Sequence, residues 1–253
     1  QADTAAVSRN FVHDFNPFYP KGVDMSGVAE HPIPNLGAYR FVEFPVYNLA
    51  VYPFYLLFGV DEKYSRLASV LFSLGSILFL YLITKKYAGT ATGLLAAFIF
   101  AVLPFNVFFS RSTLPEPTFI FFSLGMIYFI DQRKLASGLI FSAIAFLIKP
   151  WAIFFVLPLI YGALPLKKKY VLLGFLAILP FAIWRLWILQ YPEGIPASNW
   201  LFNGDEIRFR PAFWWWIISE RIGREILGVT GAFLFFLGLI LKPKNGYFLH
   251  IWA

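Results

Sequence analysis

Cysteine is absent from this sequence, and charged residues are scarce. Without cysteine the chain has no disulfide and no thiolate for catalysis or metal binding. Only 14% of the residues are charged, whereas a typical soluble domain has about 25%. Gly-rich phosphate-binding loops and N-x-S/T sequons are also missing. These absences argue against an ordinary soluble domain and leave no place for thiol chemistry.

Hydrophobic residues are abundant instead. They make up 59% of the sequence, and aromatic residues alone make up 21%, with 31 Phe and 8 Trp. This composition is typical of a lipid-facing surface with Trp and Tyr at the membrane interfaces. The sequence pI near 9.5 would suggest nucleic acid as the partner of a soluble protein. Here the basic clusters adjoin apolar segments, so we expect anionic lipid head groups and no nucleic acid.

Basic and acidic residues are unevenly distributed along the sequence. Four breaks between apolar segments hold nine Lys or Arg residues and one acid, Asp131, whereas the rest of the chain holds twelve basic and thirteen acidic residues. Loops rich in Lys and Arg stay on the cytoplasmic side during insertion. The alternation therefore predicts a polytopic membrane protein with these four breaks on one side. Their basic residues are Lys85, Lys86, Arg133, Lys134, Lys167, Lys168, Lys169, Lys242 and Lys244.

Seven apolar segments are predicted to cross the membrane as helices, although several are shorter than the roughly 20 residues of a typical span. Residues 45–59 are shorter still and contain Pro53, so this segment is predicted to lie at the interface or to re-enter the membrane. The seven predicted spans are residues 66–84, 90–109, 117–130, 135–148, 151–166, 170–189 and 226–241.

The predicted fold class is an all-α polytopic membrane protein with one transmembrane domain over residues 1–253. The polar start has no signal peptide or span before it, and residues 247–253 resemble the start of another apolar segment. We therefore expect an internal portion of a larger protein. Its predicted parts are an outer loop with interfacial helices (1–65), a transmembrane core (66–189), a second outer loop (190–225) and further transmembrane segments (226–253).

The second outer loop contains an aromatic cluster, FWWW at 213–216, followed by IISERIGREI. Glu220/Arg224 and Arg221/Glu225 are spaced i,i+4, which favours a helix. A Trp cluster beside an amphipathic turn indicates an interfacial helix. It either anchors the chain at the aromatic belt or stacks on a sugar or lipid tail.

Six ionisable residues on the predicted outer side lie in or beside apolar segments. At membrane depth such a group costs roughly 2.5–3.5 kcal/mol on insertion scales, so it is expected to have a partner or a task. Lys149 is the sharpest case, because no polar residue lies near it in AFLIKPWAIFF. It either snorkels to the interface or serves as a fixed cation for an anionic group. The six residues are Asp3, Glu43, Arg111, Glu116, Lys149 and Arg185.

Each of the others also has a purely structural explanation. Arg185 is placed to snorkel from IWRLWIL, and Arg111 and Glu116, in a turn stiffened by prolines, are placed to form a local salt bridge.

Two acids belong to the first loop. Asp3 or Thr4 is placed to cap a helix that starts near them. Glu43, which stands in an apolar setting, is placed to pair with Arg40 or to lie at a rim.

Five segments in this order resemble the GT-C glycosyltransferases, and more narrowly the relatives of the protein O-mannosyltransferases and the lipid-A aminoarabinose transferase. The resemblance covers roughly residues 1–190. The segments are QADTAAVSRNF, EFPVYNLAVYPFYLLFG, RLASVLFSLGSILFLYLITKKYAG, LPFNVFFSRSTLPEP and FLIKP.

The resemblance implies a GT-C-like helical bundle with an extracytoplasmic first loop. Such enzymes move a sugar from a polyprenyl-phosphate carrier to an acceptor hydroxyl or amine, with inversion. Asp3 matches the family's catalytic base by position, although Thr4 stands where the family often has a second acid. Glu43 and Glu116 are then candidates for a supporting acid.

The remaining expectations concern the donor and the surroundings. Lys149, Arg111 and Arg185 are the expected ligands of the donor phosphate. The sequence indicates no cofactor with certainty, and the three acids Asp3, Glu43 and Glu116 together are able to hold Mg²⁺ or Mn²⁺ through oxygen ligands. The expected location is the plasma membrane, with the site on the extracytoplasmic face and a glycan, lipid or protein as acceptor.

Two other functions fit parts of the pattern. A transporter or flippase also has charged residues in its spans, but it should show repeats and ionisable groups near the membrane centre. A scaffold subunit would not need Asp3 for activity. The transferase hypothesis requires Asp3 and Lys149 to meet in one pocket at the exoplasmic rim.

Overall fold

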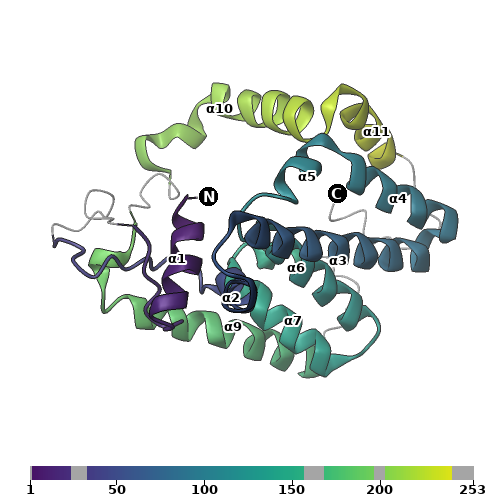
Figure 1. Ribbon diagram of the computed structural model, residues 1–253. Coiled ribbons are helices and arrows are strands. Elements are labelled where there is room, and N and C mark those ends of the chain that lie inside the picture. The colour runs from purple at the N-terminus through teal and green to yellow at the C-terminus, as the bar shows by residue number, and fades with distance from the viewer. Residues whose placement is uncertain (1, 24–32, 157–167, 197–202, 241–253) are drawn as a thin grey trace.

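The computed structural model describes residues 2–23, 33–156, 168–196 and 203–240 (Figure 1). Within these ranges the regular secondary structure is helical, apart from an isolated antiparallel bridge between Lys21 and Tyr39, and turns and irregular segments connect the helices. The α-helices are α1 (Ala2–His13), α2 (Val46–Phe58), α3 (Glu62–Ala88), α4 (Thr90–Val102), α5 (Pro104–Phe109), α6 (Glu116–Asp131), α7 (Leu135–Ile148), α9 (Lys168–Ile188), α10 (Pro211–Trp215) and α11 (Gly228–Ile240). The others are the 3₁₀ helices η1 (Pro192–Gly194) and η3 (Gly204–Phe209) and the π-helix η4 (Trp216–Ile226).

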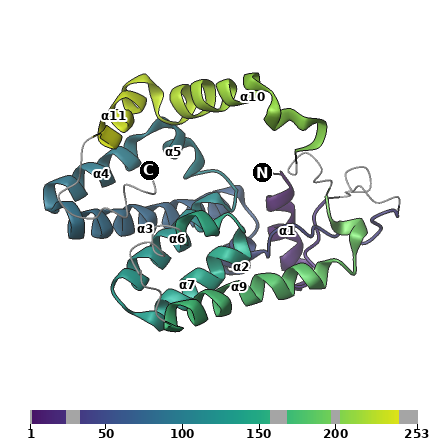
Figure 2. The same ribbon diagram turned by 180° about the vertical axis from the view of Figure 1, so that it is seen from behind.

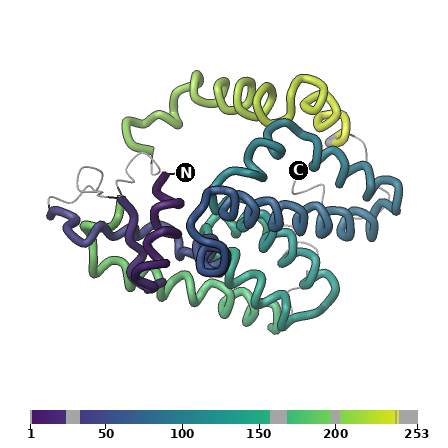
Figure 3. The backbone as a smooth tube through the Cα atoms, in the orientation of Figure 1, coloured from purple at the N-terminus to yellow at the C-terminus, as the bar shows by residue number. Residues whose placement is uncertain are grey.

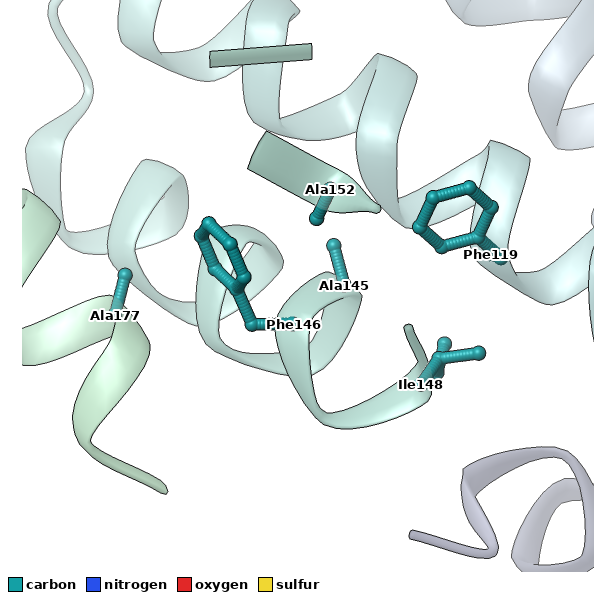
Figure 4. Close-up of a cluster of buried hydrophobic side chains, with 6 residues drawn as sticks. All are labelled: Phe119, Ala145, Phe146, Ile148, Ala152 and Ala177. Carbon is teal, nitrogen blue, oxygen red and sulfur yellow. The ribbon is translucent and has the colours of Figure 1, made fainter. Parts of the chain in front are cut away.

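Helices α4, α3, α6, α7 and α9 pack in that spatial order, each against the next. Figure 2, which shows the molecule from behind, has α7 and α9 side by side along its lower edge. Buried side chains of α6, α7 and α9 meet in one cluster, which includes Phe119, Phe146 and Ala177 (Figure 4). Small residues let the backbones approach, as is usual where helices pack within lipid.

The two long helices of this layer expose most of their apolar surface. Helices α3 and α9 are long and apolar enough to cross a membrane. In the most apolar 18-residue stretch of each helix, only 28% of the residues of α3 and 22% of those of α9 are buried. Leu71, Leu74 and Leu78 of α3 and Phe175 and Ile183 of α9 are at least half exposed. Soluble proteins rarely expose apolar patches of this size. The exposed faces therefore indicate contact with lipid.

Helices α1 and α2 run across the direction of α3 (Figure 1). Helix α2 buries Tyr47, Val51 and Tyr55 against its neighbours and contains Pro53 without ending there. A crosswise orientation is the one expected of the predicted interfacial helix over residues 45–59.

The prediction of one continuous helix over residues 90–109 is wrong. The helix stops at Val102, Leu103 is extended (φ −58°, ψ 122°), and α5 begins at Pro104. Proline lacks a backbone N–H and disfavours the helical conformation of the residue before it. Pro104 therefore divides the segment into two shorter helices.

Most of the other predicted boundaries agree with the structure to within a few residues. The predicted spans 66–84, 117–130, 135–148, 170–189 and 226–241 correspond to α3, α6, α7, α9 and α11. In the fifth predicted span, residue 151 is in a turn and residues 152–156 are helical. Residues 157–166 lie outside the described residues, together with Lys167, Lys242, Lys244 and 247–253.

The chain from α10 through η4 to α11 passes along α5, on the opposite side of the layer from α7 and α9 (Figure 3). Both predicted i,i+4 pairs are confirmed in η4: Arg224 binds Glu220 at 2.9 Å, and Arg221 binds Glu225. Trp215 is 72% exposed. The exposed tryptophans and paired charges suit a membrane interface, and both predicted roles for them remain open.

The two ends of the helix layer carry different charges. Helices α3 and α6 are parallel, because Ser65 contacts Thr113 near their starts and Lys86 binds Asp131 near their ends. Lys85 and Arg133 therefore share the second end, as the charge pattern predicts. The first end holds Asp3, Arg40, Glu43, Glu116 and Lys149.

Close packing of α6 on α7 gives a stability prediction. A Cβ atom at Gly125 would collide with the ring of Phe141, whereas one at Gly174 of α9 would meet nothing within 4 Å. Overpacking a helix contact costs about 1–3 kcal/mol. Gly125→Leu should therefore lower the thermal unfolding midpoint in detergent by several degrees. Gly174→Leu is the matched control, and equal midpoints for the two variants would contradict this packing.

Candidate active site

Helix α1 is held in place by a buried amide on α2. The Asn48 side-chain nitrogen donates to the Thr4 carbonyl oxygen at 2.7 Å and to the Ser8 hydroxyl at 2.8 Å. Asp3 lies in the first turn of α1, which begins at Ala2, rather than at the predicted cap position. A carboxylate there is favoured by the helix dipole, and its side chain turns toward the first loop.

The partner of Asp3 is Arg40, with Nε 3.4 Å from Oδ2. Backbone hydrogen bonds fix this part of the loop: the Arg40 N–H donates to the Pro20 carbonyl oxygen, and the Phe41 N–H donates to that of Gly194, both at 2.8 Å. Phe41 is fully buried against Trp184 at the end of α9. Packing and backbone bonding thus position the guanidinium beside Asp3.

Lys149 follows the last residue of α7 and meets two carboxylates. Its Nζ lies 2.6 Å from Glu116 Oε1 and 3.8 Å from Glu43 Oε1, and its side chain is only 20% exposed. Glu116 is the first residue of α6, so this ion pair joins the adjoining ends of α6 and α7. Lys149 therefore has two carboxylate partners, which supports the expectation that a charged residue at this position has a partner.

Two other local explanations also fail. The alternative of a Glu43–Arg40 pair is wrong, because Arg40 binds Asp3 and Glu43 binds Lys149. The alternative of an Arg111–Glu116 pair is wrong, because Glu116 binds Lys149 while Arg111 is exposed.

A buried polar network fixes the loop that precedes Glu116. The Tyr47 hydroxyl donates to the Ser65 carbonyl oxygen at 2.7 Å, and the Ser65 and Thr113 hydroxyls lie 2.9 Å apart. The Ser69 hydroxyl donates to the Ser112 carbonyl oxygen at 2.7 Å. Burial raises the pKa of Tyr47 to about 12. Tyr47 therefore stays protonated at physiological pH and acts as a hydrogen-bond donor rather than a base.

Three cavities adjoin this charged cluster. Asp3, Arg40 and Glu43 line a small one of about 40 Å³. Glu116 lies at the edge of an apolar cavity of about 390 Å³ between α3, α4, α5 and α6. A larger apolar cavity of about 740 Å³ follows α9 and reaches Phe44. Polar groups therefore lie between two cavities that suit apolar chains.

The structure brings four of the six predicted site residues into one charged cluster: Asp3, Glu43, Glu116 and Lys149. Asp3 and Lys149 meet indirectly: Glu43 lines the pocket of Asp3 and contacts Lys149. Arg111 and Arg185 are exposed, and among the described residues neither forms an ion pair with this cluster. Their binding of phosphate stays a prediction.

Sequence reasoning missed Arg40 and Asn48 as parts of the site. Arg40 was considered only as a partner of Glu43. Asn48 gave a usable signal, because it is a polar residue inside the apolar segment 45–59 and makes two hydrogen bonds to α1.

The acids do not form a ready metal site. Within the ranges that the structure describes, no three His, Cys, Asp or Glu residues converge on one point. The Lys149 ammonium contacts both Glu43 and Glu116, where a cation would need their oxygens. A divalent ion stays a prediction, and no chemical step below uses one.

Together these features define a class: an all-helical polytopic membrane protein with an acid–base cluster at one end of its bundle. A sequence model of the dolichyl-phosphate-mannose-protein mannosyltransferase family matches residues 42–187. That match covers more than half of the chain, so the protein belongs to this family. The resemblance to GT-C glycosyltransferases is thereby confirmed at the level of the family.

Two further proteins are similar. An uncharacterized protein of Aquifex aeolicus (strain VF5) is 33% identical over 111 residues, which are 44% of this chain and 27% of that protein. The crystal structure of ArnT from Cupriavidus metallidurans in the apo state superimposes with a TM-score of 0.58 and 14% identity, over 99% of this chain and 52% of ArnT. The similarity to ArnT supports the predicted fold, and this chain spans about half of that protein.

A double-mutant cycle tests the ion pair at the centre of the site. Lys149→Met and Glu116→Gln should show a coupling of about 0.5–1 kcal/mol in unfolding free energy, because the pair is partly buried. The exposed pair Arg66/Glu62 is the matched control and should give a smaller coupling. Additive effects of the two substitutions at Lys149 and Glu116 would contradict the ion pair.

Proposed function

We propose that this protein is an inverting glycosyltransferase that moves a sugar from a polyprenyl-phosphate-linked donor to an acceptor hydroxyl or amine. The family membership supports the reaction class, and the similarity to ArnT supports the bundle that would carry it. The observation that carries the proposal is the charged cluster around Asp3, Arg40, Glu43 and Lys149 with apolar cavities on either side.

Asp3 is the proposed general base. Its carboxylate lines the small pocket and is partly exposed, so an incoming acceptor is able to reach it. As the acceptor oxygen or nitrogen attacks the anomeric carbon, its proton passes to Asp3. The bond between the anomeric carbon and the carrier's phosphate oxygen breaks at the same time. The carrier phosphate leaves with the electron pair, and attack from the opposite face inverts the anomeric centre.

The developing negative charge on the phosphate needs a nearby cation. Fixed cations stabilise such charge best where water is scarce. Arg40 and Lys149 both lie at this end of the bundle and are held by ion pairs. The carrier's isoprenoid chain would occupy one of the apolar cavities, while its phosphosugar stays at the membrane surface.

Glu116 and Lys149 lie at helix ends rather than in helix centres. A transporter or flippase would place its ionisable groups near the membrane centre, so this geometry favours the transferase. We place the protein in the plasma membrane, with the site on the extracytoplasmic face and a glycan, lipid or protein as acceptor.

Substitution of the base tests the reaction. Asp3→Asn should lower the turnover number about 10²–10⁴-fold without weakening donor binding, because only proton removal is lost. The measurement is the initial transfer rate in membranes supplied with polyprenyl-phosphate sugar. Asp14→Asn, at an exposed carboxylate paired with Lys21, should leave the rate unchanged. Normal turnover in Asp3→Asn would remove Asp3 as the base.

The orientation of the protein in the membrane is testable by cysteine labelling, because the sequence contains no cysteine of its own. Ala2→Cys and Lys168→Cys introduce exposed thiols at the first and second ends of the bundle. In sealed cells a membrane-impermeant maleimide should label the first variant and not the second. The reverse pattern would place the charged cluster on the cytoplasmic side.

A further inference from the structure

The turn between α6 and α7 ends α6 with a Schellman motif. The Arg133 N–H donates to the Ile130 carbonyl oxygen, and the Lys134 N–H donates to that of Phe129, both at 2.9 Å. This pair of hydrogen bonds requires Arg133, the residue after the helix cap, to adopt a left-handed backbone conformation. Arg133 does so, with φ 60°.

Arginine is an unusual residue for this conformation. A Cβ atom crowds the following carbonyl oxygen in the left-handed region, so glycine is the usual residue at this point of the motif. The same chain uses glycine at the ends of α2 and α3, where Gly59 and Gly89 have φ values of 84° and 87°. Arg133 therefore makes the turn less stable than glycine would. A cation kept at such a position is expected to have a task.

The positive charge around this turn is only partly balanced. The acid of the turn is Asp131, and its carboxylate already binds the Lys86 ammonium of α3 at 2.6 Å. Lys85, Arg133 and Lys134 are exposed, and in the part of the chain that the structure describes none of the three forms an ion pair. An anion that approaches the adjoining ends of α3 and α6 would thus meet three unpaired cations.

The side chains around the turn also suit the head-group level of a bilayer. The Lys85 ammonium lies 5.5 Å from the centre of the Tyr81 ring, and tyrosines are enriched at membrane interfaces. Further along the helices, toward the centre of the bundle, Leu78 of α3 and Ile140 of α7 are 55% and 58% exposed. A lipid here would have cations at its head group and apolar side chains along its acyl chains.

We propose that the α6–α7 turn and the end of α3 bind the phosphate of an anionic phospholipid of the bilayer. Arg133 donates to the phosphate oxygens through its planar guanidinium, which matches their geometry. Lys134 and Lys85 add positive charge, and each basic residue near a membrane surface strengthens the attraction. The site lies at the opposite end of the bundle from Asp3 and is independent of the proposed transferase function.

The test uses Arg133→Gly, which should change stability and lipid binding in opposite directions. Relief of the left-handed strain should raise the thermal unfolding midpoint in lipid-free detergent by about 2–4 °C. Loss of one cation should lower the retention of phosphatidylglycerol relative to phosphatidylcholine about fivefold. Native mass spectrometry of the full-length protein measures this ratio in mixed micelles of the two lipids with identical acyl chains.

Three control variants separate charge from backbone strain. Arg133→Lys keeps both, so its midpoint and its lipid ratio should stay near those of the wild type. Ala38→Gly relieves a left-handed residue in the first loop, where φ is 51°, and should raise the midpoint without changing the lipid ratio. Arg66→Gln removes a cation that Glu62 already balances at the other end of α3, and it should also leave the ratio unchanged.

Several results would overturn the inference. One is a wild-type lipid ratio in a folded Arg133→Gly variant, and another is equal retention of the two lipids by the wild-type protein. A lower midpoint in Arg133→Gly would contradict the strain at the turn, and a fivefold loss in Ala38→Gly would show that charge is not the cause. These measurements do not involve Asp3, so the transferase proposal is tested separately.

Discussion

The ion pair between Lys149 and Glu116 is the interaction on which the rest of this structure depends. It joins the end of α7 to the start of α6 and, through Glu43, attaches the first loop to both helices. An unpaired charged lysine beside apolar segments would raise the free energy of the folded protein. The ion pair with Glu116 offsets part of that cost. Removing the lysine would leave two carboxylates close together. The arrangement of acids around the Asp3 pocket follows from this constraint.

Much of the helical layout could be predicted from the sequence, because the signals are local. Basic residues after apolar segments fix which helix ends lie together, and the Lys86–Asp131 contact is consistent with that assignment. The i,i+4 pairs of η4 needed only helical spacing. The broken segment 90–109 was missed even though Pro104 marks it, because the apolar pattern continues through the break.

The site itself was only partly predictable. The free-energy cost of an ionisable group at membrane depth identified Lys149 and the acids as residues that need partners. That cost does not indicate which partner each residue has. Lys149 and Glu116 are 33 positions apart, and Asn48 and Thr4 are 44 apart. Such contacts arise from the packing of helices rather than from sequence spacing. The contact between Arg40 and Asp3 depends on the backbone bonds of Arg40 to Pro20 and of Phe41 to Gly194, and no sequence pattern reports those bonds.

An experimental structure of the full-length protein with bound polyprenyl phosphate would test the central claim most directly. The account predicts the phosphate beside the cluster of Asp3, Arg40 and Lys149, and the isoprenoid chain in one of the two apolar cavities that adjoin this cluster. A phosphate bound instead at the opposite end of the bundle, near Lys85 and Arg133, would contradict it.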